Sequence, residues 1–201
     1  MNDIIRKNKV IGFYLLAVVL IVIDQLTKFY FSKLGYGESV PVIGTFLQFT
    51  HVENPGMAFG ITFGWAKIFL SLFSIVASVF LIVYLSKIKD AKLWVKIGIA
   101  FVAAGAMGNG IDRVFYGMIF HYGPMFYGKV IDWVQVDIPD INFLFIRWSY
   151  FPIFNVADSS ITIGACILIL MYKHLPFLEK KTVEENVLTE DTAKEDNELI
   201  N

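Results

Sequence analysis

The sequence predicts an all-α membrane protein with four transmembrane helices and a small β-rich loop between the first two helices. Hydrophobic residues make up 56% of the 201 residues and charged residues only 17%. The apolar residues also gather in four long runs. A soluble domain is about half apolar and about a quarter charged. The chain therefore suits a lipid bilayer better than water.

Each apolar run is close to the length of a membrane span. A helix needs about 20 apolar residues to cross a hydrocarbon core of about 30 Å, and lipid offers a non-helical segment no hydrogen-bond partners. We expect the spans at about 10–31, 68–85, 93–114 and 151–172. The second run contains no charged residue, whereas each of the other three contains at least one.

The first run also resembles a secretory signal peptide, because basic residues precede an apolar core. It ends in a polar segment without a small-residue cleavage site, Asp24-Gln25-Leu26-Thr27-Lys28. We therefore interpret this run as a retained transmembrane helix.

Basic residues predict the orientation, because cytoplasmic loops are enriched in lysine and arginine. Such residues precede the first span, lie between the second and third spans, and follow the fourth: Arg6, Lys7, Lys9, Lys87, Lys89, Lys92, Lys96, Lys173, Lys180 and Lys181. Both termini and the middle loop are then cytoplasmic (N-in, C-in), and segments 33–66 and 115–150 face outward.

The two outward segments differ in composition. Residues 40–53 carry Val, Phe and Thr and lead into the turn Asn54-Pro55-Gly56, which favours short strands in an outer-face loop. Residues 115–151 are rich in Phe, Tyr and Trp, which is typical of an aromatic belt at the membrane–water boundary.

The C-terminal tail differs from the rest of the chain. Eight of the 18 acidic residues lie in 179–201, a segment without aromatic residues. We expect one transmembrane domain at 1–174 and a disordered, acidic cytoplasmic tail at 175–201.

Composition also argues against several functions. A net charge of −1 and the absence of a basic binding motif argue against nucleic acid as a partner. The single cysteine, Cys166, excludes an internal disulfide and a multi-cysteine metal site. The three histidines are scattered, which argues against a histidine-based metal site.

Polar residues of three predicted spans fall at one depth. With a rise of about 1.5 Å per residue, Asp24 lies about 10 Å below the outer surface and Asn109 about 8 Å below it. If the fourth span begins at Phe151, Asp158 lies about 10 Å below the same surface. The second span has no comparable residue. We expect a polar layer in the outer half of the bilayer.

Helical spacing suggests partners for some of these residues. Asp24 and Lys28 are four residues apart with the acid first, which is the favourable order for an ion pair. Asp112 is adjacent to Arg113, and we interpret both couples as structural pairs. Asp158 has no basic residue at helical spacing, which favours a functional role. From composition alone, Asp132 is equally compatible with a loop acid and a catalyst.

Five short motifs carry these polar residues in order: Asp24-Gln25-Leu26-Thr27-Lys28, Asn54-Pro55-Gly56-Met57-Ala58-Phe59-Gly60, Gly108-Asn109-Gly110-Ile111-Asp112-Arg113, Val130-Ile131-Asp132-Trp133 and Phe154-Asn155-Val156-Ala157-Asp158-Ser159. On a four-span frame they resemble lipoprotein signal peptidase (signal peptidase II), a family of bacterial aspartyl proteases of the inner membrane. The resemblance covers about residues 10–174.

This resemblance implies an endopeptidase that hydrolyses the bond before the lipidated cysteine of a diacylglyceryl-modified prolipoprotein and releases the signal peptide. It implies a catalytic pair, Asp132 and Asp158. It also implies five residues near the substrate: Asn54, Gly56, Asn109, Arg113 and Asn155. Three further positions are implied to be more architectural: Asp24, Lys28 and Asp112.

The resemblance further implies that membrane lipid surrounds the enzyme and that no metal or cofactor is needed. It implies inhibition by peptide antibiotics such as globomycin, and an active site near the outer (periplasmic) leaflet of the bacterial inner membrane. Two features depart from the family pattern. Trp133 stands where Phe is usual, and the stretch between the two aspartates is longer, with Asp137, Asp140 and the aromatic run 143–151.

Two other functions are compatible with intramembrane acids. A small four-span transporter could use Asp24, Asp112, Asp132 and Asp158 as ion or proton sites. A membrane scaffold without chemistry would tolerate loss of the Asp158 carboxylate. Cleavage of a lipidated precursor separates both from a peptidase.

Overall fold

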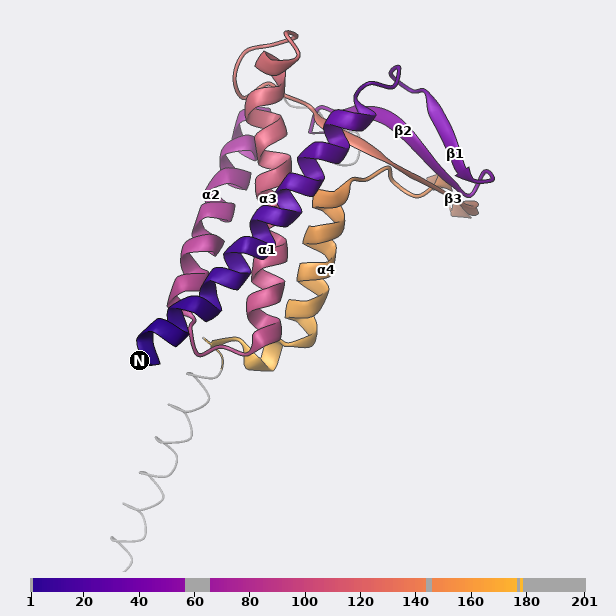
Figure 1. Cartoon of the computed structure of the whole chain (residues 1–201). Helices are drawn as coiled ribbons and strands as arrows, with labels where there is room; N and C mark the ends of the chain where they lie inside the picture. Colours follow the sequence, from indigo (N-terminus) through magenta and orange to yellow (C-terminus); the bar gives the residue numbers. More distant parts are fainter. Residues whose placement is uncertain (1, 57–65, 144–145, 177, 179–201) are drawn as a thin grey trace, which may run out of the picture.

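The computed structural model describes residues 2–56, 66–143, 146–176 and 178. Four helices pack side by side, and a small sheet lies at the end of the bundle opposite the N-terminus (Figure 1). Most of the predicted tail at 175–201 lies outside the described residues.

The helices are α1 (Asn2–Phe31), α2 (Ala66–Lys87), α3 (Leu93–Ile119) and α4 (Val156–Leu170), followed by the short helix η1 (Tyr172–His174). The first three contain stretches that are long and apolar enough to cross a membrane: Val10–Phe31, Ile68–Lys87 and Leu93–Ile119. The chain is thus a helical protein of the membrane type. The orientation of its termini stays a prediction.

The fourth predicted span is wrong at its start. Helix α4 begins at Val156 and not at 151, and it has 15 residues. Phe154 and Val134 exchange backbone hydrogen bonds of 2.8 and 3.2 Å, which hold the segment before the helix in an extended conformation. Asn155 then caps the helix. A tertiary strand contact thus replaces the first turns of the expected helix.

Helix α3 is the central helix of the bundle and packs against α1, α2 and α4. Its buried face is lined by small residues, and Gly108 shows why one of them must be so small. A Cβ atom on Gly108 would lie 2.5 Å from Asp24 Oδ2, so only glycine lets α1 place its carboxylate there. By contrast, large apolar side chains on α2 remain exposed, as on a lipid-facing helix: Phe69, Phe73, Val76 and Phe80.

The sheet has four antiparallel strands in the order β1 (Ser39–Ile43), β2 (Leu47–Asn54), β3 (Val130–Phe143) and β4 (Ile146–Tyr150). The sequence predicted strands only in the loop between the first two spans, and the structure has strands in the segment between α3 and α4 as well. The long segment between the two aspartates supplies β4 and most of β3. Strand β2 pairs Val52 with Asp132 and Asn54 with Val130.

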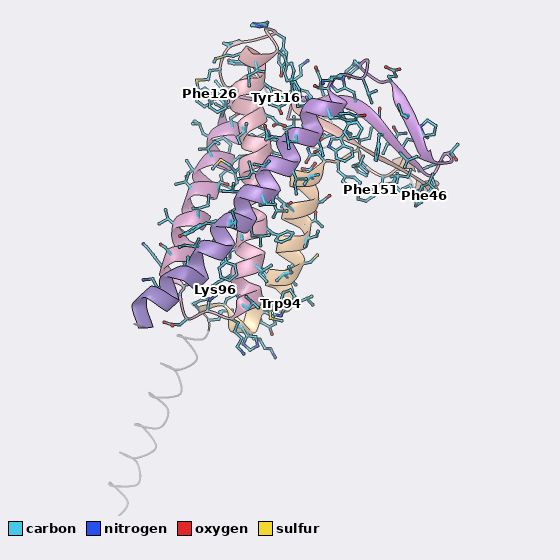
Figure 2. All side chains as sticks on the ribbon, viewed as in Figure 1. Phe46, Trp94, Lys96, Tyr116, Phe126 and Phe151 are labelled. Carbon is cyan, nitrogen blue, oxygen red and sulfur yellow. The ribbon has the colours of Figure 1, made fainter. Side chains whose placement is uncertain are left out.

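An aromatic cluster fastens this sheet to the end of α1. The rings of Phe31 and Trp133 stack with centroids 4.2 Å apart, and Phe49 lies 4.9 Å from Phe31 and 5.2 Å from Trp133. Figure 2 shows that Phe46 and Phe151 lie on the sheet side of the molecule, far from Lys96 and Trp94 at the opposite end of α3. Trp133 therefore uses its large ring to join β3 to α1, next to Asp132.

Candidate active site

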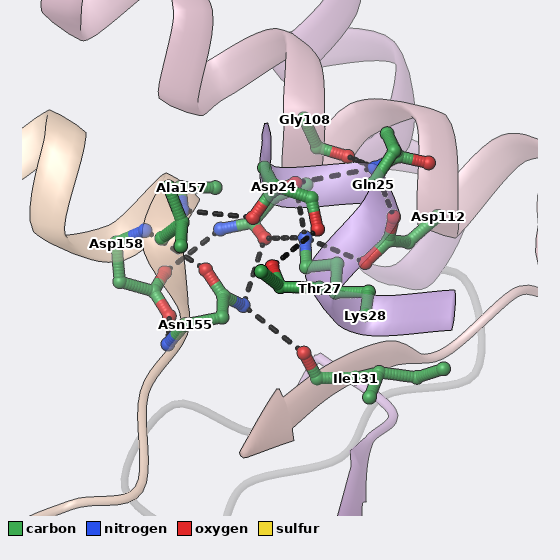
Figure 3. A network of polar contacts seen from close by, with 12 residues as sticks. Asp24, Gln25, Thr27, Lys28, Gly108, Asp112, Ile131, Asn155, Ala157 and Asp158 are labelled. Atoms are coloured by element: carbon green, nitrogen blue, oxygen red, sulfur yellow. Dashed lines mark hydrogen bonds and ion pairs between the residues drawn. The ribbon is translucent and has the colours of Figure 1, made fainter. Parts of the chain in front are cut away.

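The polar residues of α1, α3, β3 and α4 meet at the end of the bundle that carries the sheet (Figure 3). Asp24 and Lys28 come from α1, Asn109 and Asp112 from α3, and Asp158 from α4. The polar residues that were predicted to share one depth therefore lie together in one polar layer, although α4 reaches it by another route. The depth of this layer in a bilayer stays a prediction.

Asp158 lies in the first turn of α4 and not two turns inside a helix that begins at 151. Its Oδ2 accepts a hydrogen bond from the Asn155 backbone N–H at 3.1 Å, and the Asn155 side chain accepts one from the Asp158 N–H at 2.9 Å. This reciprocal capping box fixes the carboxylate at the helix start. Its other oxygen, Oδ1, accepts from Asn109 Nδ2 at 2.8 Å.

Asp132 lies on β3 and is buried. Its Oδ1 accepts a hydrogen bond from Asn155 Nδ2 at 2.7 Å, and its Oδ2 accepts one from Asn54 Nδ2 at 3.3 Å. Burial raises the pKa of Asp132 to about 7, and the negative charge of Asp158 acts in the same direction. A carboxyl group with this pKa can hold or release a proton near neutral pH.

The two aspartates open onto one cavity of about 580 Å³. Its remaining lining is mostly apolar, with a few polar groups: Asn54, Phe151, Pro152, Ile153, Phe154, Ser159, Thr162 and Ile163. A mostly apolar cavity with a few convergent polar groups is typical of a ligand site. Among the described residues, therefore, Asp132 and Asp158 are the acids of the polar layer that face open space.

Lys28 neutralises a second group of carboxylates behind this cavity. Its Nζ lies 2.8 Å from Asp24 Oδ2 and 2.8 Å from Asp112 Oδ2, and it donates to Asn109 Oδ1 at 2.9 Å. The pairing of Asp24 with Lys28 predicted from their spacing is confirmed. The pairing of Asp112 with Arg113 is wrong, because adjacent helical residues point about 100° apart and Asp112 turns toward α1.

Gln25 and Tyr116 join this group, and neither was singled out by residue type. Gln25 Nε2 donates to Asp112 Oδ1 at 2.8 Å and to the Gly108 carbonyl at 3.1 Å, and Tyr116 Oη donates to Gln25 Oε1 at 3.1 Å. Two features of the sequence could have pointed to these residues. Gln25 adjoins Asp24 in the first motif, and Tyr116 lies four residues after Asp112 on the same helix.

Asp24 also connects the buried group to α4. Its Oδ1 accepts a hydrogen bond from the Ala157 backbone N–H at 2.9 Å. An acid beside the first turn of a helix is favourable, because unpaired N–H groups and the helix dipole point toward it. Asp24 therefore holds the start of α4, one residue before Asp158.

Arg113 and Gly56 complete the set of residues that the sequence singled out. Arg113 Nη1 donates to the Asn109 carbonyl at 3.3 Å, and its buried Nε has no hydrogen-bond partner within the described part of the chain. Gly56 has a φ of +91°, and its N–H donates to Asn54 Oδ1 at 2.9 Å. This turn orients the Asn54 side chain whose amide reaches Asp132.

The chain is similar in sequence to known proteins of one family. A family profile described as signal peptidase (SPase) II matches residues 16–173. Lipoprotein signal peptidase of Chlorobium phaeobacteroides (strain BS1) is 38% identical over 164 residues, covering 80% of this chain and 94% of that protein. Lipoprotein signal peptidase of Amoebophilus asiaticus is 35% identical over 188 residues, covering 81% of this chain and 78% of that protein.

The fold has a counterpart among solved structures. A bacterial membrane enzyme determined by the in meso method at 2.3 Å shares 34% identity and a TM-score of 0.62, covering 81% of this chain and 88% of that one. The prediction of a small transporter finds no support in these matches, since the profile and both relatives are peptidases.

Proposed function

The chain belongs to the signal peptidase II family, and we propose from this that it removes signal peptides from prolipoproteins by aspartic endopeptidase chemistry at Asp132 and Asp158. The bond cut is the one before the diacylglyceryl-modified cysteine. The observation that carries this assignment is the cavity onto which both carboxylates open.

The pair of carboxylates shares one proton. Two carboxylates in a poorly hydrated site cannot easily ionise together, and the pKa of about 7 at Asp132 follows from burial and from the neighbouring charge of Asp158. At neutral pH one member is a base while the other is an acid. Because the two groups are coupled, the shared proton belongs to the pair.

Hydrolysis then proceeds in two steps. The ionised carboxylate takes a proton from a water molecule as that water attacks the peptide carbonyl, and the protonated carboxyl group donates to the carbonyl oxygen. In the second step the C–N bond of the tetrahedral diol breaks: the protonated member of the pair gives its proton to the leaving amine, and the ionised member takes a proton from one diol hydroxyl. The pair again holds one proton. No metal or cofactor enters this scheme.

Three asparagine amides keep the carboxylates in position. Asn155 contacts both aspartates, Asn109 donates to Asp158, and Asn54 donates to Asp132. Amides suit this task because they donate hydrogen bonds without adding a charge that would suppress the shared proton. Gly56 supports Asn54 through the turn described above.

Arg113 binds substrate and takes no part in proton transfer. An arginine remains protonated at neutral pH, and its planar group can donate to ester and peptide carbonyl oxygens. The buried Nε, which has no hydrogen-bond partner among the described residues, supports this role, because such a donor is costly and a bound ligand would satisfy it. Peptide antibiotics such as globomycin would compete for the same donors.

The apolar lining of the cavity suits the substrate. Phe151, Ile153, Phe154 and Ile163 form a surface for the lipid anchor and the signal segment. In the orientation inferred from the basic residues, this surface lies near the outer leaflet of the bacterial inner membrane. A lipid-anchored cysteine would present its scissile bond at the same level.

A cleavage assay tests the proposal. Purified protein in liposomes is given a lipidated precursor and, separately, the same precursor without its diacylglyceryl group. We expect release of the signal peptide from the lipidated form alone. An enzyme that cleaves neither form, or that moves ions without cleaving, would contradict the proposed activity.

A further inference from the structure

A second cavity, called here the rim cavity, lies near the ends of β2 and β3 that are next to the catalytic site. It measures about 440 Å³ and is lined by Tyr36, Glu53, Pro55 and Lys129. Glu53 and Pro55 flank Asn54, which lines the catalytic cavity. The two cavities are therefore lined by consecutive residues of the chain where β2 ends, close to the start of β3.

The charged groups of this rim cavity are fixed in place yet open to solvent. Lys129 Nζ lies 2.5 Å from Glu53 Oε2, with the two side chains 36% and 26% exposed. The Lys129 backbone N–H donates to Tyr122 Oη at 2.8 Å, and its ammonium group lies 5.1 Å from the centre of the Tyr122 ring. The hydrogen bond to Glu53 raises the pKa of Lys129, so this group is an ammonium at neutral pH.

The backbone beneath Lys129 is equally constrained. The Gly128 N–H donates to the Arg113 carbonyl at 2.9 Å, and a Cβ atom at Gly128 would lie 1.9 Å from the Asp112 carbonyl oxygen. Glycine is required for this approach, which ties the start of β3 to the helix that carries Arg113. An exposed ion pair contributes little to stability. The fold is therefore held by the backbone contacts, and the ion pair is available for another role.

The direction of the substrate identifies that role. On α4 the lining of the catalytic cavity extends to Thr162 and Ile163. Helix α4 runs away from the sheet (Figure 1), so this side of the cavity suits the signal segment. The residues after the scissile bond must leave in the other direction, past Asn54. An extended chain advances about 3.3 Å per residue, so the rim cavity lies within reach of the first few residues after the cleaved bond.

We propose that the Glu53–Lys129 cavity is a binding subsite for the polar residues that follow the lipidated cysteine. The Lys129 ammonium donates to backbone carbonyls or acidic side chains of that segment, and the Glu53 carboxylate accepts from its N–H groups. Tyr36 and Pro55 form the apolar walls. This inference rests on the proposed peptidase function. It adds a site that recognises the substrate residues on the C-terminal side of the cleaved bond.

Two lipidated precursors with the same signal segment test the proposal. The short one ends at the lipidated cysteine as an amide, and the long one continues for several polar residues. We expect wild-type enzyme to have a higher kcat/KM for the long substrate. Lys129→Met should lower the long-to-short ratio of kcat/KM by about threefold to tenfold, mainly through KM, because a charged hydrogen bond is lost.

Two further variants keep the test decisive. Glu53→Gln removes the opposite charge and should also lower the ratio. Lys33→Met is the matched control, because Lys33 is another exposed lysine, with Nζ 5.0 Å from the Phe29 ring and outside the cavity lining, so the ratio should stay at the wild-type value.

The alternative outcomes differ clearly. If the ion pair only supports the fold, both substrates lose kcat equally and the ratio is unchanged, which overturns the subsite. A wild-type ratio of one would overturn it as well. Failure of the wild-type enzyme on both substrates would overturn the peptidase function and the subsite with it.

Discussion

Two groups of carboxylates lie side by side at the sheet end of the bundle. Asp24 and Asp112 share the Lys28 ammonium and are sealed between α1 and α3. Asp132 and Asp158 are held by neutral amides and face a cavity. An ammonium group at hydrogen-bond distance compensates the burial of Asp24 and Asp112, whereas the two acids at the cavity have only amide partners at that distance among the described residues. The direct partners of the four acids thus distinguish the sealed group from the group that opens onto the cavity.

The largest expected effect comes from removing a carboxylate that faces the cavity. Asp132→Asn and Asp158→Asn should each lower kcat by about 10⁴-fold, because an amide cannot take a proton from water. Asn has nearly the same shape, so the melting temperature should stay close to that of wild type. Asp90→Asn, in the turn between α2 and α3, is the control and should retain wild-type kcat. Near-normal turnover in either active-site variant would exclude the catalytic assignment.

The second effect concerns the sealed group. Lys28→Met leaves two buried carboxylates without their cation, and we expect the free energy of unfolding to fall by about 3–5 kcal/mol. Turnover per folded molecule should fall less. The matched control is Lys129→Met, which breaks a half-exposed pair and should cost less than about 1 kcal/mol. Denaturation in detergent measures both. An unchanged stability with lost activity would place Lys28 in the catalytic centre instead.

An intermediate effect is expected for Arg113, which lies on α3 between the two groups. Arg113→Ala should lower kcat/KM for lipidated precursor by about tenfold to hundredfold, since a charged donor to the substrate is lost. It should also weaken globomycin binding. Arg113→Lys should recover part of the loss, because lysine keeps the charge but lacks the planar group. Wild-type kcat/KM and inhibitor affinity in Arg113→Ala would leave this residue only a structural role.

The smallest effect per step of the change applied is a pH dependence of stability, which is spread over about three pH units. The pKa of Asp132 is about 7 in the folded protein, well above that of a solvated aspartate. The folded state therefore binds more protons than the unfolded state between about pH 4 and pH 7, and stability should fall as pH rises through that window. The expected slope is about 1 kcal/mol per pH unit. Asp132→Asn should flatten this slope, and an identical slope in both proteins would show that Asp132 is not the group responsible.

Sequence reasoning reached much of this site for a physical reason. Buried charges in a membrane helix are costly, so each polar residue in an apolar run signals a partner or a function. That signal singled out Asp24, Lys28, Asn109 and Asp158. It could not distinguish Asp132 from an ordinary loop acid, because Asp132 lies on a strand outside the spans. Only the family resemblance assigned it a role.

The sequence by itself predicted the apolar helices, the i,i+4 pair of Asp24 with Lys28, and the strand-forming character of residues 40–53. These features depend on composition and on contacts within one turn of a helix or along one strand. The partner of Asp112, the start of α4 and the second half of the sheet depend on packing between distant segments. Lys28 and Asp112 are 84 positions apart, and Val134 stops α4 from starting earlier by binding Phe154. Such contacts leave no local periodicity, so only the folded chain decides which acids pair with Lys28 and which ones open onto the cavity.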